Sequence, residues 1–440
     1  MGLQKQQKMT MKISQSTDKI SPFGGFNFCH KLLNDTGIPQ LVDRELGARV
    51  QTVGFGYSDI FSNHMAVFLS GGDCTEDIQE HLHDHLQKVK GLSVCSADTI
   101  LRGIKELATP VEELTGPTGV KHFFNINKPL NKLMVKALIK TKQLKAGPGT
   151  DYTLDYDNQV VPTEKYDALK TYKHCEGYQP GVASIGKLVV YIEGRNGNSQ
   201  AKYQQAETLG RAFALLEDNQ INTERFRADS ASYQQAVVEL SEKKSRYFYI
   251  RAMRCDNMEQ QIAALPKDAW KKIRLGVQEM EVAQIENYFP FGGEKAYRLV
   301  VSRIKRKDGQ TGLFTGDAHT YRGILTNDRA WDNGQVVSFY NQRGATERTF
   351  DMMNNDFGWG KLPCSFLHEN TAFMLMTAIY SNLYQFIIAT FSKKVSWLKE
   401  NFRLKKFVFR FITVAAKWIR TGGRDVLKLY TTKDYSPLLC

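Results

Sequence analysis

Residues 151–161 read DYTLDYDNQVV, and this stretch decides the fold class. Its aromatic, β-branched and aliphatic side chains are typical of a β-strand. Asp155 and Asp157 lie two positions apart, so on a strand both carboxylates belong to the same face. A carboxylate inside a strand is costly to bury unless it is paired or binds a cation. The segment therefore predicts a sheet and, on one of its faces, a candidate site.

Strands and helices alternate along the chain after this first strand. The segments are the strands 187–194, 225–230 and 247–253 and the helices 200–219 and 231–244. Such alternation predicts an α/β domain. The strand RFRADS (225–230) places Asp229 at its end, which makes this residue a second candidate for the same site.

The remaining segments divide the chain by their pattern. The polar N-terminus is expected to be disordered, and helical periodicity follows it as far as about residue 115. The predicted divisions are a disordered N-terminus (1–20), a helical domain (21–115), a basic connector (116–150), an α/β core in two parts (151–272 and 332–392), a β-rich insertion (273–331) and basic C-terminal helices (393–440).

The chain is basic, and its excess charge is unevenly distributed. Its 440 residues carry a net charge of +13, and 42% of them are hydrophobic, which is enough for a large core. The segment from Lys393 to Asp434 holds 12 Lys/Arg and 3 Asp/Glu, so most of the excess lies near the C-terminus. A protein of this charge is expected to bind an anionic partner.

Cysteine usage and hydropathy indicate a cytoplasmic protein without a membrane anchor. The 7 cysteines are scattered without a C-x-x-C pair, which argues against a disulfide framework or a thiolate zinc site. Residues 371–391 carry no charge and are long enough to span a bilayer. Because Ser381, Asn382 and Gln385 lie in the middle of this segment, we expect a helix buried in a large core.

The candidate carboxylates suit one particular chemistry. Carboxylate oxygens are hard ligands that favour Mg²⁺ or Mn²⁺. Two such ions about 4 Å apart can activate a water or a 3′-hydroxyl and stabilise the leaving oxygen of a phosphodiester. That reaction needs about three carboxylates from separate elements, and Asp229 and Glu347 join the Asp155/Asp157 strand as candidates.

The stretch 340–347, YNQRGATE, contains the third carboxylate. Tyr340, Arg343 and Glu347 are spaced i, i+3 and i+7, so on one helix they share a face. That face could hold a carboxylate with a cation and a phenol beside it. The alternative is a solvated face whose Arg–Glu pair contributes little.

These segments together resemble bacterial insertion-sequence transposases of the DDE type. The resemblance rests on TLDYDNQ, on FRADS and on YNQRGATE, which matches the signature Y-x2-R-x3-E of that family. GYQPG (177–181), the helix with ETLGR, and FGWGKLP with ENTAFM (within 357–374) are similar to one subgroup of these proteins. The resemblance covers roughly residues 20–432, and the long gap from Asp229 to Glu347 fits members with a β-rich insertion.

The resemblance implies a fold and a set of site residues. The fold is an RNase H-like mixed sheet flanked by helices, with the β-rich insertion and an all-helical N-terminal domain that binds DNA. The metal ligands are Asp157, Asp229 and Glu347, which hold two Mg²⁺ or Mn²⁺ ions, and Asp155 remains open as the alternative first Asp. Tyr340 and Arg343 hold a DNA phosphate near the metals.

One position departs from the family signature. The signature continues to a Lys seven residues after the Glu, and this chain has Asn354 there. The corresponding phosphate contact is lost or is replaced, and Arg348 is the candidate replacement.

Further residues are candidates for DNA contact. Trp331 either stacks on a displaced base or is a buried aromatic beneath the insertion. The segment 393–410 interleaves basic and aromatic residues and is predicted to be a helix that follows the DNA backbone, with a membrane surface as the alternative. Its candidate contacts are Lys405, Lys406 and Arg410.

The predicted function is DNA transposition. The protein would bind terminal inverted repeats, hydrolyse the DNA at the element ends and transfer the freed 3′-hydroxyl into target DNA. Bringing two ends together implies at least a homodimer. Two alternatives stay open: a catalytically decayed DNA-binding derivative of such an element, and an RNase H-fold nuclease without strand transfer.

Overall fold

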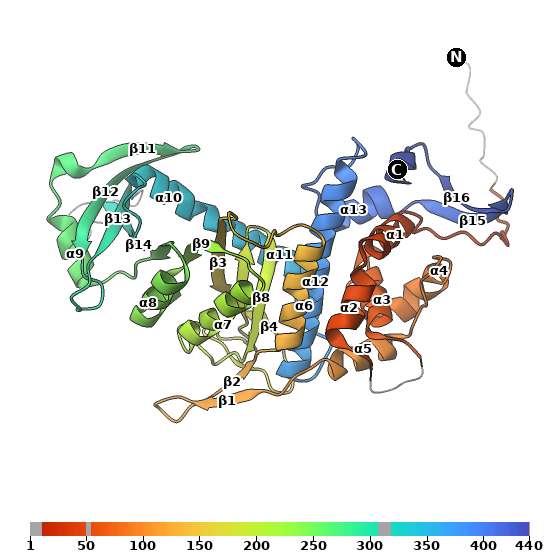
Figure 1. The fold of residues 1–440 in the computed structure, drawn as a ribbon, viewed down its shortest axis with the longest axis horizontal. Coiled ribbons are helices and arrows are strands. Elements are labelled where there is room, and N and C mark those ends of the chain that lie inside the picture. Colours follow the sequence, from red (N-terminus) through yellow and green to blue (C-terminus); the bar gives the residue numbers. More distant parts are fainter. Residues whose placement is uncertain (1–10, 50–53, 307–317, 440) are drawn as a thin grey trace, which may run out of the picture.

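The computed structural model describes residues 11–49, 54–306 and 318–439. Among these residues, eleven strands form one mixed sheet, and helices flank it on both faces (Figure 1). The predicted α/β class is therefore confirmed. Of the N-terminus predicted to be disordered, residues 11–20 contain no helix or strand, and residues 1–10 lie outside the described part of the chain.

The large sheet has the order β1-β2-β8-β7-β3-β9-β10-β14-β13-β12-β11. Its strands are β1 Glu112–Thr115, β2 Lys121–Asn125, β3 Tyr152–Asn158, β7 Gly181–Ile185, β8 Leu188–Arg195, β9 Thr223–Ala228, β10 Tyr247–Arg251, β11 Lys271–Leu275, β12 Gln278–Tyr288, β13 Tyr297–Lys305 and β14 His319–Thr326. A small sheet holds β4 Val161–Pro162, β5 Leu169–Lys170 and β6 Glu176–Tyr178, and a separate hairpin holds β15 Ala415–Thr421 and β16 Arg424–Tyr430.

The helices fall into three groups along the chain. The N-terminal group contains α1 Phe26–Thr36, α2 Ile38–Leu46, α3 Tyr57–Leu69, the π-helical turn η1 Ile78–Leu82, α4 His83–Leu86 and α5 Ala97–Glu106. The helices within the α/β part are α6 Lys128–Lys140, α7 Gln205–Asp218, η2 Ser230–Ser232, α8 Gln235–Lys244, α9 Asp256–Ala263 and η3 Lys267–Ala269. The last group is α10 Asn333–Asn341, η4 Gln342–Gly344, α11 Ala345–Asp356, η5 Trp359–Lys361, α12 Leu367–Ser392, α13 Leu404–Phe407, η6 Val408–Ile412 and η7 Ser436–Leu439.

The centre of the sheet combines both strand directions. β3 is antiparallel to β7 and parallel to β9, which is parallel in turn to β10. Leu154 and Tyr156 of β3 are buried in one core cluster with α7 and α8. Since side chains alternate along a strand, Asp155 and Asp157 belong to the opposite face.

The insertion extends the same sheet. Its strands β11 to β14 form antiparallel pairs, and β14 also pairs with β10, with Tyr249 opposite Thr326. The insertion lies at one end of the molecule, far from the N-terminal helices (Figure 1). The strands predicted between residues 273 and 331 are present, but they continue the core sheet through main-chain hydrogen bonds. Residues 307–317 of the insertion lie outside the described part.

Two asparagines take the place of a strand along the free side of β8. β2 pairs only with Gly194 and Arg195 at the end of β8. Further along, Asn382 of α12 accepts a hydrogen bond from the Val189 N–H (3.0 Å) and donates one to the Val189 carbonyl (2.7 Å). Asn131 of α6 does the same for the N–H and carbonyl of Ile192, at 2.8 Å each. The buried backbone of β8 is thereby satisfied by two helices.

This arrangement explains the polar residues in the apolar helix α12. In the part of the chain that the structure describes, α12 is the one helix long and apolar enough to cross a membrane, and 83% of its most apolar window is buried inside the protein. Asn382 is fully enclosed because it serves β8. The prediction of a helix buried in a large core is confirmed.

The connector and the C-terminal segment contain the following elements. The connector 116–150 contains β2 and α6, whose residues Leu133 and Met134 are buried in the core. The C-terminal helices predicted for 393–440 are wrong: only the short α13 and the turns η6 and η7 are helical, and β15–β16 form a hairpin. Gly422 and Gly423, with φ of 55° and 74°, supply the two left-handed positions of a tight hairpin turn.

We expect the replacement Asn382→Leu to destabilise the fold, because it leaves the buried N–H and carbonyl of Val189 without partners. Each such group costs roughly 1–3 kcal/mol, so the free energy of unfolding should fall by about 2–6 kcal/mol in urea denaturation. The neighbouring Ser381→Ala is the control, since that hydroxyl contacts only the Met352 sulfur at 4.0 Å among the described residues. Equal effects of the two variants would contradict this role of Asn382.

Candidate active site

Two of the predicted carboxylates meet at the carboxyl ends of β3 and β9. The parallel register places Tyr156 opposite Ala228, so the next residues on each strand, Asp157 and Asp229, are neighbours. Adjacent strands lie about 4.8 Å apart, and both residues belong to the face away from α7 and α8. Ligands of open α/β sheets commonly bind at this end of the strands.

Asp229 occupies a partly buried position at the start of η2. Its Oδ1 accepts a hydrogen bond from the Ala231 N–H at 3.0 Å, which caps the turn. Burial raises the pKa of the Asp229 carboxyl group above its usual value, and the negative charge of Asp157 raises it further. Two carboxylates this close disfavour each other's ionisation unless a cation lies between them.

Arg343 is the cation that the structure places beside the two carboxylates. Its Nη1 donates to Asp157 Oδ2 at 2.9 Å, and both side chains are less than one-fifth exposed, at 17% and 19%. Burial alone would lower the pKa of Arg343, but the charges of Asp157 and Asp229 outweigh it and raise the pKa above the ordinary value. Arg343 therefore stays charged and partly neutralises the pair.

Asp155 has a different environment from Asp157. It is 2% exposed, and both of its oxygens accept hydrogen bonds from Arg227, from Nε and Nη2 at 2.7 Å each. Arg227 also donates from Nη1 to the Phe339 carbonyl of α10 at 2.6 Å. Burial raises the pKa of Asp155 against the opposing effect of Arg227. The Asp155–Arg227 pair therefore joins β3, β9 and α10.

The stretch 340–347 is helical, but it is not the single α-helix that we predicted. α10 ends at Asn341, a 3₁₀ turn covers Gln342–Gly344, and α11 begins at Ala345. Tyr340 is 4% exposed, and its hydroxyl donates to the Ala228 carbonyl at 3.1 Å. The Tyr340 hydroxyl bonds to the end of β9 in this structure, and its predicted phosphate contact stays a prediction.

Glu347 lies apart from the other two carboxylates. It is on the first turn of α11, as predicted for a helical residue, but its side chain is exposed. The structure records no hydrogen bond or ion pair of Glu347 with any residue it describes. Arg348 is likewise exposed, and Asn354 is half-buried. The structure thus brings together Asp157, Asp229 and Arg343, and it leaves Glu347 and Arg348 facing solvent.

Trp331 packs within the protein. Its ring stacks on Tyr249 with centroids 5.8 Å apart and meets Phe339 edge-on at 5.1 Å. The Arg225 guanidinium lies 4.6 Å from the ring centroid. In this structure Trp331 is a packed aromatic, and its stacking on a displaced base stays a prediction.

The basic C-terminal candidates are exposed. Lys405 and Lys406 lie on α13 and Arg410 on η6, while the other side of these turns packs Phe407 into the core. Lys406 lies 4.5 Å from the Phe402 ring centroid. These three residues form a solvated basic surface.

Two arginines near the carboxylates were not among the predicted site residues. Arg227 lies two residues before Asp229, and Arg251 ends β10, where the register with β9 continues from Ile250 and Ala228. The signal was available: in RFRADS and YFYIRAM each arginine falls on the strand face that carries the aspartates. These arginines were not predicted as site residues, because an arginine near the end of a strand is as often part of a structural ion pair as of a binding site.

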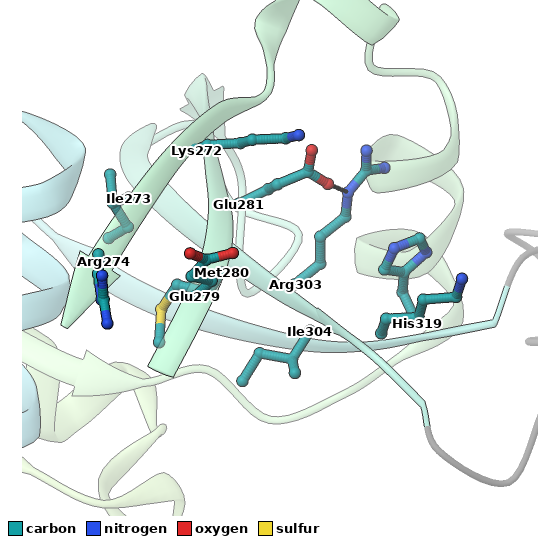
Figure 2. Close-up of a pocket in the computed structure, with 10 residues that line it drawn as sticks. Lys272, Ile273, Arg274, Glu279, Met280, Glu281, Arg303, Ile304 and His319 are labelled. Carbon is teal, nitrogen blue, oxygen red and sulfur yellow. Dashed lines mark hydrogen bonds and ion pairs between the residues drawn. The ribbon is translucent and has the colours of Figure 1, made fainter. Parts of the chain in front are cut away.

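A hollow on the insertion is separate from these carboxylates. It has a volume of about 520 Å³ and lies on β11, β12 and β13 (Figure 2). Arg303 and Glu281 face each other across it and form an ion pair of 2.8 Å. Its lining includes four Lys or Arg residues and two Glu residues, and it lies on the insertion, separate from the carboxylate pair.

The donor set of the carboxylate pair suits a hard divalent cation. Asp157 and Asp229 offer only oxygen ligands, and burial together with the charge of Asp157 raises the pKa of Asp229. A divalent ion would offset these charges, and the described residues around the pair include no thiol or imidazole that would favour a softer metal. The residues present therefore fit Mg²⁺ or Mn²⁺.

Comparison with known proteins identifies the family. The family model described as Transposase DDE domain group 1 matches residues 3–439. None of the curated proteins compared matches the chain. Among solved structures, a piggyBac transposase synaptic complex with hairpin DNA is similar at 12% identity and a TM-score of 0.41, over 89% of this chain and 80% of that one.

The family match spans nearly the whole sequence, including both strands of the carboxylate pair, the insertion and the segment 340–347. DDE transposases use divalent metal ions, in accord with the oxygen ligands described above. The chain belongs to the DDE transposase family and is a DNA transposase.

Proposed function

We propose that this transposase cuts DNA at the ends of its element with Asp157, Asp229 and Glu347 as ligands of two divalent metal ions. The observation that carries the proposal is the placement of Asp157 and Asp229 side by side on parallel strands, with Arg343 against them. In a member of the DDE family, an acidic pair at this end of the sheet is the natural position for the metals.

The order of the central strands supports an RNase H-like core. In β8-β7-β3-β9-β10 the first three strands are antiparallel and the last three are parallel. This is the arrangement expected of an RNase H-like sheet, whose first and fourth strands carry the acidic residues. β3 and β9 hold these two places in the chain.

Asp157, and not Asp155, is the first catalytic residue in this proposal. Both oxygens of Asp155 are occupied by Arg227, whereas Asp157 has one charged contact and adjoins Asp229. Bound Mg²⁺ or Mn²⁺ ions supply activation of the attacking water or 3′-hydroxyl and stabilisation of the leaving oxygen. Arg343 holds the Asp157 carboxylate in place before DNA arrives and then contacts a backbone phosphate.

Glu347 completes the site when DNA binds. It follows the 3₁₀ turn at 342–344 and lies on the exposed first turn of α11, so DNA and solvent can reach its carboxylate. Tyr340 fixes the other side of the turn through its bond to β9. Together these residues supply the Y-x2-R-x3-E signature of insertion-sequence transposases, with Tyr340 as a positioning residue.

The charge distribution supports DNA as the partner. The helical segment 21–115 binds the terminal inverted repeats, and the exposed Lys405, Lys406 and Arg410 contact the backbone of element or target DNA. Two copies act together on two ends, as a homodimer in a bacterial cytoplasm. Arg348 replaces the phosphate contact that Asn354 lacks.

Asn354 also motivates a second candidate. Without the family Lys, the chain could be a decayed derivative that binds DNA but does not cut it, or a nuclease without strand transfer. Cleavage and joining assays on one DNA distinguish the three functions, since only a transposase joins the freed 3′-end to a target.

Cleavage is the first test. With Mg²⁺ and a labelled duplex carrying the element's own end, we expect cuts at the element boundary. Asp229→Asn and Glu347→Gln should each lower the rate by roughly 100-fold or more, because a metal ligand contributes several kcal/mol to the transition state. DNA binding in gel shifts should be retained. Cleavage by Glu347→Gln at the wild-type rate would show that Glu347 is not a metal ligand.

The two aspartates of β3 should respond differently to the same change. Asp155→Asn leaves the buried Arg227 charge unpaired and should lower the free energy of unfolding by about 3–5 kcal/mol. Asp157→Asn relieves repulsion with Asp229 and should leave stability unchanged or raised, while abolishing cleavage. Urea denaturation of both variants checks this, and the reverse pattern would make Asp155 the catalytic residue.

Metal binding can be measured without DNA. Mn²⁺ at 100 times its dissociation constant should stabilise the wild type by about 2.7 kcal/mol, seen as a higher thermal midpoint. Asp157→Asn and Asp229→Asn should lose this shift, and Glu347→Gln should keep it, because Glu347 joins only with DNA. The shift should weaken as pH falls through the raised pKa of Asp229, since the protonated carboxyl group no longer binds the ion. An unchanged shift in Asp229→Asn would contradict the assignment.

A further inference from the structure

A second hollow adjoins the carboxylates, where β10 ends beside β14. Its volume is about 380 Å³, and it is lined by Ser230, which follows Asp229, and by Arg251, Arg254, Tyr321 and Arg322. Three of its lining residues are therefore arginines, two from the core strand β10 and the loop after it and one from the insertion strand β14. Nothing in the proposed metal chemistry uses these residues.

The sheet register aligns this hollow with the carboxylates. Asp155, Arg227 and Tyr249 are opposite one another on β3, β9 and β10. Two residues further on, Asp157, Asp229 and Arg251 form the next row on the same face. Adjacent strands lie about 4.8 Å apart, so Arg251 is as close to Asp229 across the sheet as Asp229 is to Asp157.

Arg322 lies near Arg251 on the insertion side, two residues beyond the row. Arg251 pairs with Ile324 across the antiparallel β10–β14 ladder, and Arg322 lies two residues from Ile324 on the same face. The face thus changes from two carboxylates on β3 and β9 to Arg251 on β10, with Ile324 opposite it on β14 and Arg322 two residues beyond Ile324. A negatively charged chain that crosses the carboxylates must pass these arginines.

The two arginines lack acidic partners. Among the residues that the structure describes, no carboxylate lies within ion-pair distance of Arg251 or Arg322. Arg251 is half-buried, with its guanidinium 4.7 Å from the centroid of the Tyr340 ring. Burial lowers the pKa of Arg251, and the charges of Arg322 and Arg343 act in the same direction. An anion in the hollow would offset this uncompensated charge.

Three arginines near the hollow or elsewhere in the insertion form ion pairs. Arg303 pairs with Glu281 (Figure 2), and Arg329 pairs with Glu286 at 2.6 Å. Arg254, on the rim of the hollow, pairs with Glu259. Within the described residues, Arg251 and Arg322 differ from these three arginines in having no carboxylate partner.

We propose that Arg251 and Arg322 bind a phosphate group of the DNA backbone next to the phosphate that is cut. The inference rests on the proposed function of the carboxylate pair. It assigns the insertion a direct part in holding DNA, because Arg322 comes from β14. A phosphate seated there would fix the strand along the row and place its neighbour over Asp157 and Asp229.

The test measures binding and needs no cleavage. A labelled duplex carrying the element's end is titrated in Ca²⁺, which supports binding in place of Mg²⁺, and fluorescence anisotropy gives Kd for the wild type and Arg322→Ala. We expect Kd to rise about tenfold, as for loss of a charged hydrogen bond. The slope of log Kd against log salt concentration should fall by about 0.9, as for one phosphate contact. Arg251→Lys keeps a positive charge, so it should raise Kd less than Arg251→Ala does.

Arg246→Ala is the matched control. Arg246 directly precedes β10, is 70% exposed and lies at the opposite end of that strand from Arg251. Its replacement removes the same charge and should leave Kd within about twofold of the wild type, because a solvated charge outside the contact contributes little. Far-ultraviolet circular dichroism and thermal unfolding check that each variant is folded.

Neutral methylphosphonate linkages locate the phosphate. Each phosphate linkage near the cleavage site is replaced in turn, and Kd is measured for the wild type and Arg322→Ala. The difference in Kd between the two proteins should vanish when the linkage next to the scissile one is neutral. If Arg322→Ala raises Kd equally with every neutral linkage, or does not raise Kd at all, the inference is overturned, while the carboxylate assignment stays in place. A wild-type chain that bound no DNA would overturn the proposed function and this inference together.

Discussion

The buried ion pair between Asp155 and Arg227 is the constraint on which the site depends. It joins β3 to β9 at the level just before the two strands end, and Arg227 reaches on to the Phe339 carbonyl of α10. The same contact therefore fixes the register of the acidic strands and the position of the helix above them. A buried pair of this kind does not by itself guarantee stability, but removal of either partner leaves a charge that water cannot reach. Its main effect is to hold Asp157 and Asp229 side by side.

Much of this arrangement could be predicted from the sequence, since the strand patterns at 151–161 and 225–230 located both aspartates. The choice between Asp155 and Asp157 could not be predicted, because strand alternation places both on one face. Only the structure shows that Arg227 of β9 occupies Asp155 and leaves Asp157 beside Asp229. The break at Gln342–Gly344 was also hidden, since a 3₁₀ turn preserves helical periodicity over a few residues. The hairpin β15–β16 was missed although two glycines mark its turn, because its basic and aromatic residues also suit a helix on a charged surface.

The insertion is part of the core sheet. Since β14 forms a full antiparallel ladder with β13 and pairs with β10, the insertion and the acidic strands share continuous main-chain hydrogen bonds. Displacement of one relative to the other would break that ladder. The insertion is therefore positioned as firmly as the strands that carry Asp229 and Arg251, which makes it a suitable element from which to present a side chain to DNA.

The amides of Asn131 and Asn382 have a consequence for association between molecules. A strand with unpaired N–H and carbonyl groups can accept a strand from another chain, and this is a common route to aggregation. Along β8 those groups are occupied by two helices, so the strand is closed to such addition. Addition of a strand from another copy is therefore blocked along this part of β8, which leaves the terminal strands β1 and β11 as the edges of the sheet.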